Sequence, residues 1–418
     1  MQMIFRNATV WTQNGFAKQD AIFDGGVLSF SNSQIASASA SKMPVFSNCL
    51  ILPGFCDVHV HLREPGFCYK ETVASGTASA ARGGYTAICS MPNLNPVPDS
   101  RAHLDVQLAA IRKDARIAVY PYGSLTVNEA GEEMADLDGM AADAIAFSDD
   151  GKGVQNEEMM RDLMLRAKKL GKMVVAHCED NSLLHGGYIH DGTYAKEHGH
   201  RGICSESEWG PIARDLKLAK ETGCAYHVCH ISTKESVDLI RAAKAEGVDV
   251  TCETAPHYLV LCDEDLQEDG KFKMNPPLRS AADRDALIAG ILDGTIDMIA
   301  TDHAPHSLEE KARGLEKSAF GIVGLETAFP IMYTEFVKTR KMTLEHLVDL
   351  MCNNPRKRFG IASDVGFTVW DVEKAYAINP DDFASLGRAT PFEGREVFGE
   401  NLLTVYNGSV AYRRNEEE

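Results

Sequence analysis

Eight short apolar runs, each followed by a longer amphipathic segment, fill the middle of this 418-residue chain. The runs are GFCDVHV (54–60), YTAICSM (85–91), RIAVYPY (116–122), DAIAFS (143–148), KMVVAH (172–177), CAYHVCH (224–230), VDVTCET (248–254) and IDMIAT (296–301). Such runs are typical of buried parallel strands, and each parallel connection needs a returning segment that is usually a helix. The alternation predicts an α/β fold of the (β/α)₈ TIM-barrel type, with a doubly wound sheet as the alternative.

Both ends of the chain have a different pattern, with short strands separated by turns. At the start these strands are expected within 3–11, 21–30 and 33–39, and at the end within 364–372, 376–383 and 402–414. We expect the two sets to pair as one small β domain, made of residues 1–52 and 358–418, beside a barrel of residues 53–357. The last four residues, NEEE, are expected to form a frayed tail.

Two helix starts and one helix end can be placed from the sequence. Ser205 with Glu208, and Ser232 with Glu235, have the spacing of a capping box, in which a serine and a glutamate cap the same helix. The helix that starts at the second box is predicted to end at Gly247, in the position where a left-handed glycine closes a helix.

The charge balance limits the kinds of partner. Lys and Arg total 42 against 60 Asp and Glu, which gives a formal net charge of −18. A surface this acidic disfavours nucleic acid and anionic membranes. A small anionic substrate remains possible if basic residues gather in its pocket.

Cysteine use and the first residues indicate a cytoplasmic protein. The eleven cysteines have no C-x-x-C spacing, which favours reduced thiols over a disulfide framework. Arg6 comes before any apolar run, so we expect no secretory signal, and no apolar stretch has the length of a membrane span. Cys178 and Cys229 adjoin histidines of interest, but their alternation on a strand favours packing roles.

The strand ends carry an unusual number of metal-binding side chains. In a barrel enzyme the chemistry lies at the carboxyl ends of the strands. His59 and His61 share one face of the first strand because successive side chains alternate. The polar residues that end the other strands are Asn93, Asp149, Asp150, His177, His230, Asp302, His303 and His306. Four histidines and two carboxylates suit a pair of zinc-like ions about 3.5–4 Å apart.

Other histidines and one charged segment are less probable parts of this site. His227 lies three residues before His230 and should point to the opposite face, while His257 follows the seventh strand and is left open as a lining residue. We expect a solvated loop at residues 309–317. Solvated side chains are also expected in the polar segment 181–204, at His185, His190, His198 and His200.

Several of these motifs resemble one known family. The segments DVHVHLREPG, MPNLNPVPD, FSDDGKGVQ, AHCEDNSL, HVCHISTKESV, KMNPPLRS, ATDHAPH and FGIVGLET closely resemble those of bacterial class I dihydroorotases, which belong to the amidohydrolase superfamily. The resemblance is nearly continuous over residues 50–360. It implies a distorted (β/α)₈ barrel with a small β-sandwich built from both termini. It also implies reversible, zinc-dependent hydrolysis of dihydroorotate to N-carbamoyl-L-aspartate, the third step of pyrimidine biosynthesis.

The resemblance also implies roles for individual residues. One zinc would be held by His59, His61 and Asp302 and the other by His177 and His230, with Asp150 and a hydroxide between the two ions. Asp302 would be the catalytic acid and base. The residues that match substrate-binding positions are His61, Arg63, Asn93, Asn275, His306, Phe320 and Gly321.

The bridge between the metals is where this chain departs from much of the superfamily. Many members use a carboxylated lysine at the end of strand four, but this chain has Asp149 and Asp150 there, with Lys152 two residues later. Spacing alone does not choose between the two aspartates, because their side chains point to opposite faces of an extended segment. The match to the family favours Asp150.

Related activities remain alternatives at this point. Allantoinases, hydantoinases and dihydropyrimidinases share the barrel and act on cyclic amides. A non-catalytic homologue that serves as a scaffold for aspartate carbamoyltransferase is a further alternative, but such a protein should have lost metal ligands. A homodimer is the expected assembly, and aspartate carbamoyltransferase is a protein partner to test.

Overall fold

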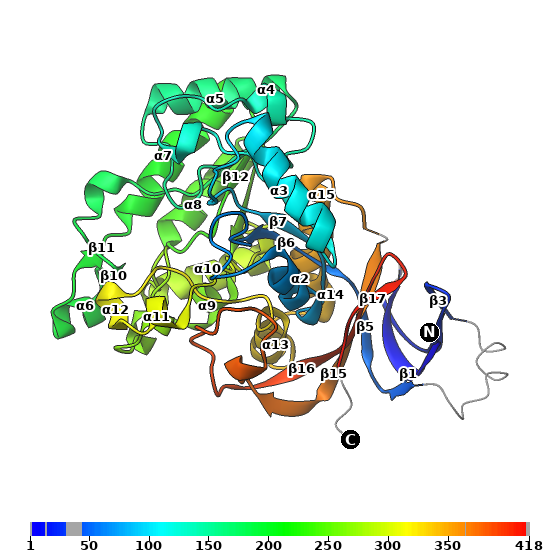
Figure 1. Cartoon of the computed structure of the whole chain (residues 1–418). Helices are drawn as coiled ribbons and strands as arrows, with labels where there is room; N and C mark the ends of the chain where they lie inside the picture. Colours follow the sequence, from blue (N-terminus) through cyan, green and yellow to red (C-terminus); the bar gives the residue numbers. More distant parts are fainter. Residues whose placement is uncertain (1, 13–14, 31–43, 364, 415–418) are drawn as a thin grey trace.

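The computed structural model describes residues 2–12, 15–30, 44–363 and 365–414. An α/β part takes up the middle of the chain, and strands from the two termini lie together on one side of it (Figure 1). The strand expected at 33–39 and the tail at 415–418 lie outside the described residues.

The α/β part contains two parallel sheets. One has the strand order β6-β7-β8, and the other has the order β14-β13-β12-β9. Their strands are β6 (Phe55–Val60), β7 (Tyr85–Ser90), β8 (Ala118–Pro121), β9 (Val174–Ala176), β12 (Tyr226–Val228), β13 (Val250–Thr254) and β14 (Met298–Ile299). These confirm seven of the eight predicted strands, although β9, β12 and β14 are short.

The predicted strand at 143–148 is not a regular strand. Phe147 forms isolated parallel bridges to Gly123 on one side and Val174 on the other, so the segment lies between the two sheets without a full ladder. A turn at 141–143 comes directly before it and shortens its extended part. At the opposite edges of the two sheets, Val60 at the end of β6 forms another parallel bridge to His303, which follows β14.

Buried side chains from both sheets form a common core. One cluster joins Cys56 and Val58 of β6 to Val175 of β9 and Met298 of β14. The two sheets therefore pack around shared apolar residues rather than forming separate layers.

Helices follow the strands and cover them. The longer ones are α2 (Val73–Arg82), α3 (Arg101–Asp114), α5 (Glu157–Lys169), α7 (Glu206–Thr222), α8 (Lys234–Ala245) and α10 (Ala281–Asp293). The shorter ones are α4 (Leu137–Met140), α6 (Thr193–His198), α9 (Pro256–Val260), α11 (Leu308–Lys311), α12 (Gly314–Lys317), α13 (Ala328–Met332), α14 (Leu344–Val348) and α15 (Asn354–Phe359). A small pair, β10 (Ile189–His190) and β11 (Gly202–Ile203), lies between β9 and α7 in the chain.

Both predicted capping boxes are wrong in detail. Ser205 precedes α7 but makes no capping bond with its side chain. The N-cap of α8 is Thr233 rather than Ser232. The end of α8 is as predicted, because Gly247 follows the C-cap with φ of 78°, a conformation that glycine adopts without strain.

The strand expected at 376–383 is wrong, because Tyr376 and Ala377 end a longer strand and a 3-10 turn follows at Pro380–Asp382. The two termini still form one sheet. Its main strand order is β17-β16-β15-β5-β1-β2-β3, and β4 pairs with β1. The N-terminal strands are β1 (Met3–Thr12), β2 (Gly15–Asp24), β3 (Val27–Ser29), β4 (Val45–Ser47) and β5 (Leu50–Pro53). The C-terminal strands are β15 (Gly366–Ala377), β16 (Glu396–Tyr406) and β17 (Ser409–Arg413). The antiparallel pairing of β5 with β15 joins the two sets.

None of the helices in the described part of the chain is both long and apolar enough to cross a membrane.

Candidate active site

A cavity of about 190 Å³ lies where the segments after the parallel strands meet. Its size suits a small molecule rather than a polymer. Ten of the twelve predicted site residues line it; His59 and His306 are the exceptions. The lining residues are His61, Arg63, Asn93, Asp150, Gly151, His177, His230, Asn275, Asp302, Ala304, Phe320 and Gly321.

One group of ligands forms around the end of β6. His61 Nε2 lies 3.1 Å from Asp302 Oδ1, and His59 Nε2 lies 3.6 Å from the same oxygen. Asp150 is equally close, with its carboxylate oxygens 3.3 Å from His59 Nε2 and 3.4 Å from His61 Nε2. Both histidines and both aspartates are buried.

A second group shares Asp150 with the first. His177 Nδ1 lies 3.0 Å from His230 Nε2. Asp150 Oδ1 lies 3.9 Å from His177 Nδ1 and 3.7 Å from His230 Nε2. The carboxylate of Asp150 therefore lies between two sets of imidazoles, as a residue that bridges two ions would.

Asp149 and Lys152, the other candidates for a bridge between the metals, bind backbone groups of the preceding loop instead. Asp149 accepts hydrogen bonds from the backbone N–H groups of Leu125 and Thr126 and from the Thr126 hydroxyl, so its carboxylate holds the preceding loop. Lys152 is exposed, and its Nζ donates to the carbonyl of Asn128.

The donor set fits metal ions. Four imidazoles and two carboxylates are the preferred ligands of zinc and similar divalent ions. Buried polar atoms are normally paired, yet several in this cluster have no hydrogen-bond partner in the described structure. They are His59 Nε2, His61 Nδ1, Asp150 Oδ1, His177 Nε2 and His230 Nδ1.

Two buried carboxylates behind the cluster hold His59 in place, and the sequence did not lead us to expect them. His59 Nδ1 donates to Glu253 Oε1 at 2.8 Å, which leaves Nε2 facing Asp150 and Asp302. Asp57 accepts from the backbone N–H of His59 and of Thr301, and so ties β6 to the segment that leads to Asp302. The available signal was that Asp57 lies two residues before His59, on the same face of one strand, and that Glu253 stands near the end of another.

The expectation for His227 is confirmed, and the expectation for Cys229 is incomplete. His227 donates toward Glu253 Oε2 at 3.1 Å and does not line the cavity, in agreement with its predicted orientation away from His230. Cys229 was expected only to pack, but its sulfur also lies close to the ligand atoms of His59 and Glu253, in a third group with metal-binding side chains.

The remaining histidines divide between solvent and the interior. His257 is buried but is not a lining residue of the cavity. His185 and His198 are exposed, as expected. His190 is buried, contrary to the prediction, because it lies on β10 beside Arg279. His200 is only partly exposed and contacts Tyr188 and Glu268 through its ring nitrogens.

Asp302 is ionised in this setting. Burial raises the pKa of its carboxyl, but the hydrogen bond from His61 and the charges of nearby histidines outweigh burial and lower the pKa to about 2. Its φ of 46° lies in the left-handed region, as do the φ values of 60° at Arg63 and 29° at His230. Such strained backbone at three neighbouring residues is typical of functional sites.

Basic side chains gather at one end of the cavity. Arg63 donates from Nε to the carbonyl of Pro305, and its Nη2 lies 3.4 Å from His306 Nε2. His306 Nε2 donates to the carbonyl of Phe320 at 2.7 Å, and Lys70 Nζ lies 3.2 Å from His306 Nδ1. Burial and the charges of Arg63, Lys70 and Lys311 lower the pKa of His306 to about 3, so its ring is neutral.

Two asparagine side chains offer unpaired acceptors in the same cavity. Asn93 Nδ2 donates to the carbonyl of Asp150 at 2.5 Å, and Asn275 Nδ2 donates to Glu179 Oε1 at 3.0 Å. The Oδ1 atoms of both asparagines are buried without a partner in the described structure. A ligand with N–H groups could satisfy them.

Proteins with similar sequences show which family the chain belongs to. A family model described as "Dihydro-orotase-like" matches residues 48–236. A protein of Fusobacterium nucleatum named dihydroorotase is 48% identical over 423 aligned residues, which cover 99% of each chain. The dihydroorotase of Geobacillus thermodenitrificans is 47% identical, again over 99% of each chain. This chain belongs to the dihydroorotase family.

Solved structures with the same fold include a hydantoinase and a dihydropyrimidinase. The L-hydantoinase (dihydropyrimidinase) of Arthrobacter aurescens superposes with a TM-score of 0.84 over 99% of this chain and 96% of that chain, at 26% identity. The dihydropyrimidinase of Brevibacillus agri superposes with a TM-score of 0.80 at 23% identity, over 99% of this chain and 95% of that chain. The higher identity to dihydroorotases favours that family over the hydantoinase alternative.

Proposed function

We propose that this chain is a dihydroorotase, which opens the cyclic amide of dihydroorotate to N-carbamoyl-L-aspartate and catalyses the reverse closure in pyrimidine synthesis. The observation that carries the proposal is Arg63 in the wall of a cavity that also contains the metal-ligand cluster. Dihydroorotate bears a carboxylate, which an arginine can bind with two parallel hydrogen bonds. Hydantoin and dihydrouracil have no such group.

We also propose two zinc ions. His59, His61 and Asp302 would hold one ion, His177 and His230 the other, and Asp150 would contact both. A pair of such ions supplies a Lewis acid for the ring carbonyl and lowers the pKa of water toward neutrality. The support is the short distances from Asp150 to ring nitrogens of all four histidines and the unpaired buried atoms among these residues.

The chain's own residues would bind and orient the ring. Arg63 would hold the substrate carboxylate, while Asn93 and Asn275 would accept from ring N–H groups with their unpaired Oδ1 atoms. The backbone of Phe320 and Gly321 would close one wall, with His306 fixing the Phe320 carbonyl. His61 would contact the substrate as well as the metal.

Asp302 would transfer the proton. Its carboxylate lines the cavity and lies 3.1 Å from His61 Nε2, where it could accept a proton from the attacking water. It would then deliver that proton to the ring nitrogen as the carbon–nitrogen bond breaks.

We also propose how the barrel and the β domain are built from the whole chain. The isolated bridges at Phe147 and between Val60 and His303 support a closed but distorted (β/α)₈ barrel of residues 53–357. The sheet of both termini would be the β-sandwich domain of residues 1–52 and 358–418. A homodimer, and association with aspartate carbamoyltransferase, remain predictions for light scattering and co-purification.

A substrate comparison tests the proposed activity. The purified zinc-loaded protein is assayed for ring opening of dihydroorotate, hydantoin, dihydrouracil and allantoin. We expect kcat/KM for dihydroorotate to exceed the other values by at least about 100-fold, in line with the loss of one buried charged hydrogen-bond pair. Faster opening of hydantoin or allantoin would contradict the proposal.

A further inference from the structure

Lys311 is buried in a segment that was predicted to be a solvated loop. Only 6% of the residue is exposed. Its Nζ donates to three backbone carbonyls, those of Gly321 at 2.7 Å, Ala319 at 2.8 Å and Lys273 at 3.0 Å. A lysine ammonium has three N–H donors and no acceptor, so these carbonyls use its full hydrogen-bonding capacity.

The three carbonyls belong to the two segments that form one wall of the cavity. Lys273 lies two residues before Asn275, and Ala319 and Gly321 flank Phe320. The N–H of Gly321 also donates to the Lys273 carbonyl at 3.1 Å. Lys311 thus joins the segment after β13 to the segment after β14, directly behind residues that line the cavity.

The segment around Lys311 is packed and capped rather than loose. Ser307 and Glu310 form a capping box at the start of α11. Ser318 Oγ donates to the Lys311 carbonyl at 2.9 Å, and a Cβ added at Gly270 would lie 2.2 Å from the same carbonyl oxygen. Leu315 is buried, whereas Arg313 and Lys317 of the same segment are exposed.

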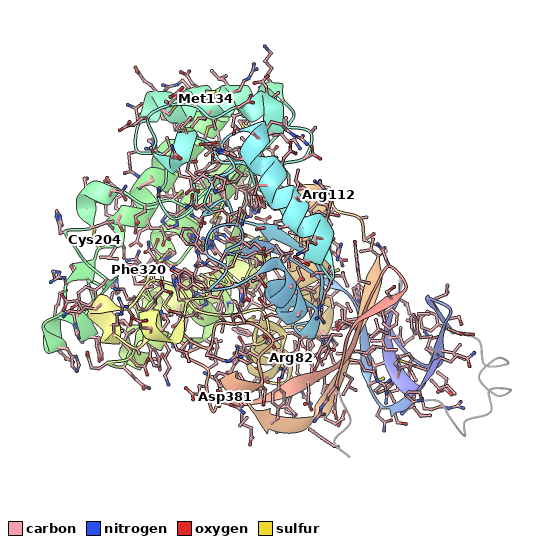
Figure 2. The ribbon with its side chains drawn as sticks, in the orientation of Figure 1. Arg82, Arg112, Met134, Cys204, Phe320 and Asp381 are labelled. Atoms are coloured by element: carbon pink, nitrogen blue, oxygen red, sulfur yellow. The ribbon has the colours of Figure 1, made fainter. Side chains whose placement is uncertain are left out.

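Lys273 reinforces the same wall from the other side. Its Nζ donates to the carbonyl of Glu316 at 2.7 Å, and it lies 4.4 Å from the centre of the Phe320 ring. A cation this close to an aromatic face favours one position of the ring. Phe320 is 37% exposed, so this contact bears on a ring that solvent and ligand can reach (Figure 2).

We propose that Lys311 is a positioning residue for the substrate, whose ammonium fixes the backbone of residues 319–321 against Asn275 and so keeps the cavity in its binding shape before substrate arrives. The inference rests on the proposed function for the identity of the substrate. It assigns the segment 307–321 the role of a fixed wall rather than a lid. Lys311 itself does not line the cavity.

Lys311→Met removes the ammonium but keeps a side chain of nearly the same length. It leaves the carbonyls of Ala319 and Gly321 without a donor, while the Lys273 carbonyl keeps only the N–H of Gly321. Buried carbonyls without partners are costly, and the two segments would separate to admit water. A cavity that must reorder its wall on binding loses affinity, whereas the groups that carry out the chemical step stay in place.

The test compares Lys311→Met with Lys317→Met, an exposed lysine of the same segment. For the cyclic amide that the wild type opens, we expect KM to rise at least about tenfold in Lys311→Met, with kcat within about threefold of wild type and zinc content unchanged. Lys317→Met should match wild type in KM and kcat.

Hydrogen exchange gives a second readout that needs no turnover. In the wild type without substrate, the amides of residues 307–321 should exchange slowly, and in Lys311→Met they should exchange at least about tenfold faster. Unchanged KM and unchanged exchange in Lys311→Met would overturn the proposal. So would fast exchange of this segment in the wild type, a result that stands even if the variant fails to fold.

Failure of the two proposals can be told apart. If the wild type does not open dihydroorotate but opens another ring, the proposed function fails, while the KM and exchange comparisons still decide the role of Lys311. If dihydroorotate is the substrate and Lys311→Met lowers kcat with KM unchanged, the positioning role is wrong and the proposed function stands.

Discussion

Arg63 is the residue that should distinguish dihydroorotate from uncharged rings. It lies at the basic end of the cavity, next to His306, with φ of 60° that the surrounding contacts maintain. Removing one partner of a buried charged pair typically costs about 2–5 kcal/mol. We therefore expect Arg63→Ala and Arg63→Lys to lower kcat/KM for dihydroorotate by at least about 100-fold, measured by steady-state kinetics.

An exposed arginine provides the control for that experiment. Arg112 lies on the surface at the end of α3, as Figure 2 shows, and Arg112→Lys should be indistinguishable from wild type. Near wild-type turnover in either Arg63 variant would show that the carboxylate is bound elsewhere.

The adjacent aspartates 149 and 150 should differ in what their loss removes. Asp150 lies between the two histidine groups, so Asp150→Asn should lose bound metal and activity. Asp149 holds Leu125 and Thr126, so Asp149→Asn should retain metal but unfold at a lower temperature. Elemental analysis and thermal melts measure both effects.

Bicarbonate dependence completes the comparison. If Asp150 contacts both ions, no carboxylated lysine is needed, and activity should not change when bicarbonate is removed. An active Asp150→Asn variant with a labile CO₂ on Lys152 in native mass spectra would reverse the assignment.

Among the elements, the contact between α7 and α8 depends on one buried glutamate. Glu208 accepts from the backbone N–H groups of Ser232 at 2.9 Å and Thr233 at 3.0 Å, and from the hydroxyl of Ser236 at 2.7 Å. Glu208→Ala would leave these donors unpaired, which we expect to lower the free energy of unfolding by about 3 kcal/mol. Denaturant unfolding measures it.

The matched variant is Glu206→Ala in the first turn of the same helix. Glu206 is exposed, so this change should cost less than about 1 kcal/mol. Equal stability of the two variants would show that the α7–α8 contact does not depend on Glu208.

The strands and strand-end ligands could be predicted because both signals are local. An apolar run such as Tyr85–Ser90 needs burial, and a histidine or aspartate at its end must lie at the rim if the sheet is parallel. His61, His177, His230 and Asp302 were placed in this way, and the structure brings them to one cavity.

The predictions were wrong where a side chain forms hydrogen bonds to residues outside its own helix or charged run. Glu208 has the spacing to cap its own helix but bonds the start of the next one. Lys311 stands in a charged run that is typical of a solvated segment, yet it is buried by hydrogen bonds to three carbonyls that lie outside that run. His190 was assigned to solvent from polar neighbours. No local pattern contains these partners, because tertiary packing brings them together.

For the whole molecule, the reaction fixes how the equilibrium depends on pH. Ring opening creates a second carboxylate and releases a proton near neutrality, so the apparent equilibrium constant for hydrolysis should rise about tenfold per pH unit. Between pH 6 and pH 8 the ratio of open to closed product should rise about 100-fold, approached from either side. A ratio independent of pH would mean that another reaction is catalysed.

Titration of the metal-free protein with zinc, followed by dihydroorotate hydrolysis at each step, tests the central claim most directly. Because Asp150 lies within 4 Å of ring nitrogens from both histidine pairs, we expect no activity without metal and full activity only near two equivalents of zinc per chain. Full activity at one equivalent, or hydrolysis by the metal-free protein, would contradict a two-metal dihydroorotase.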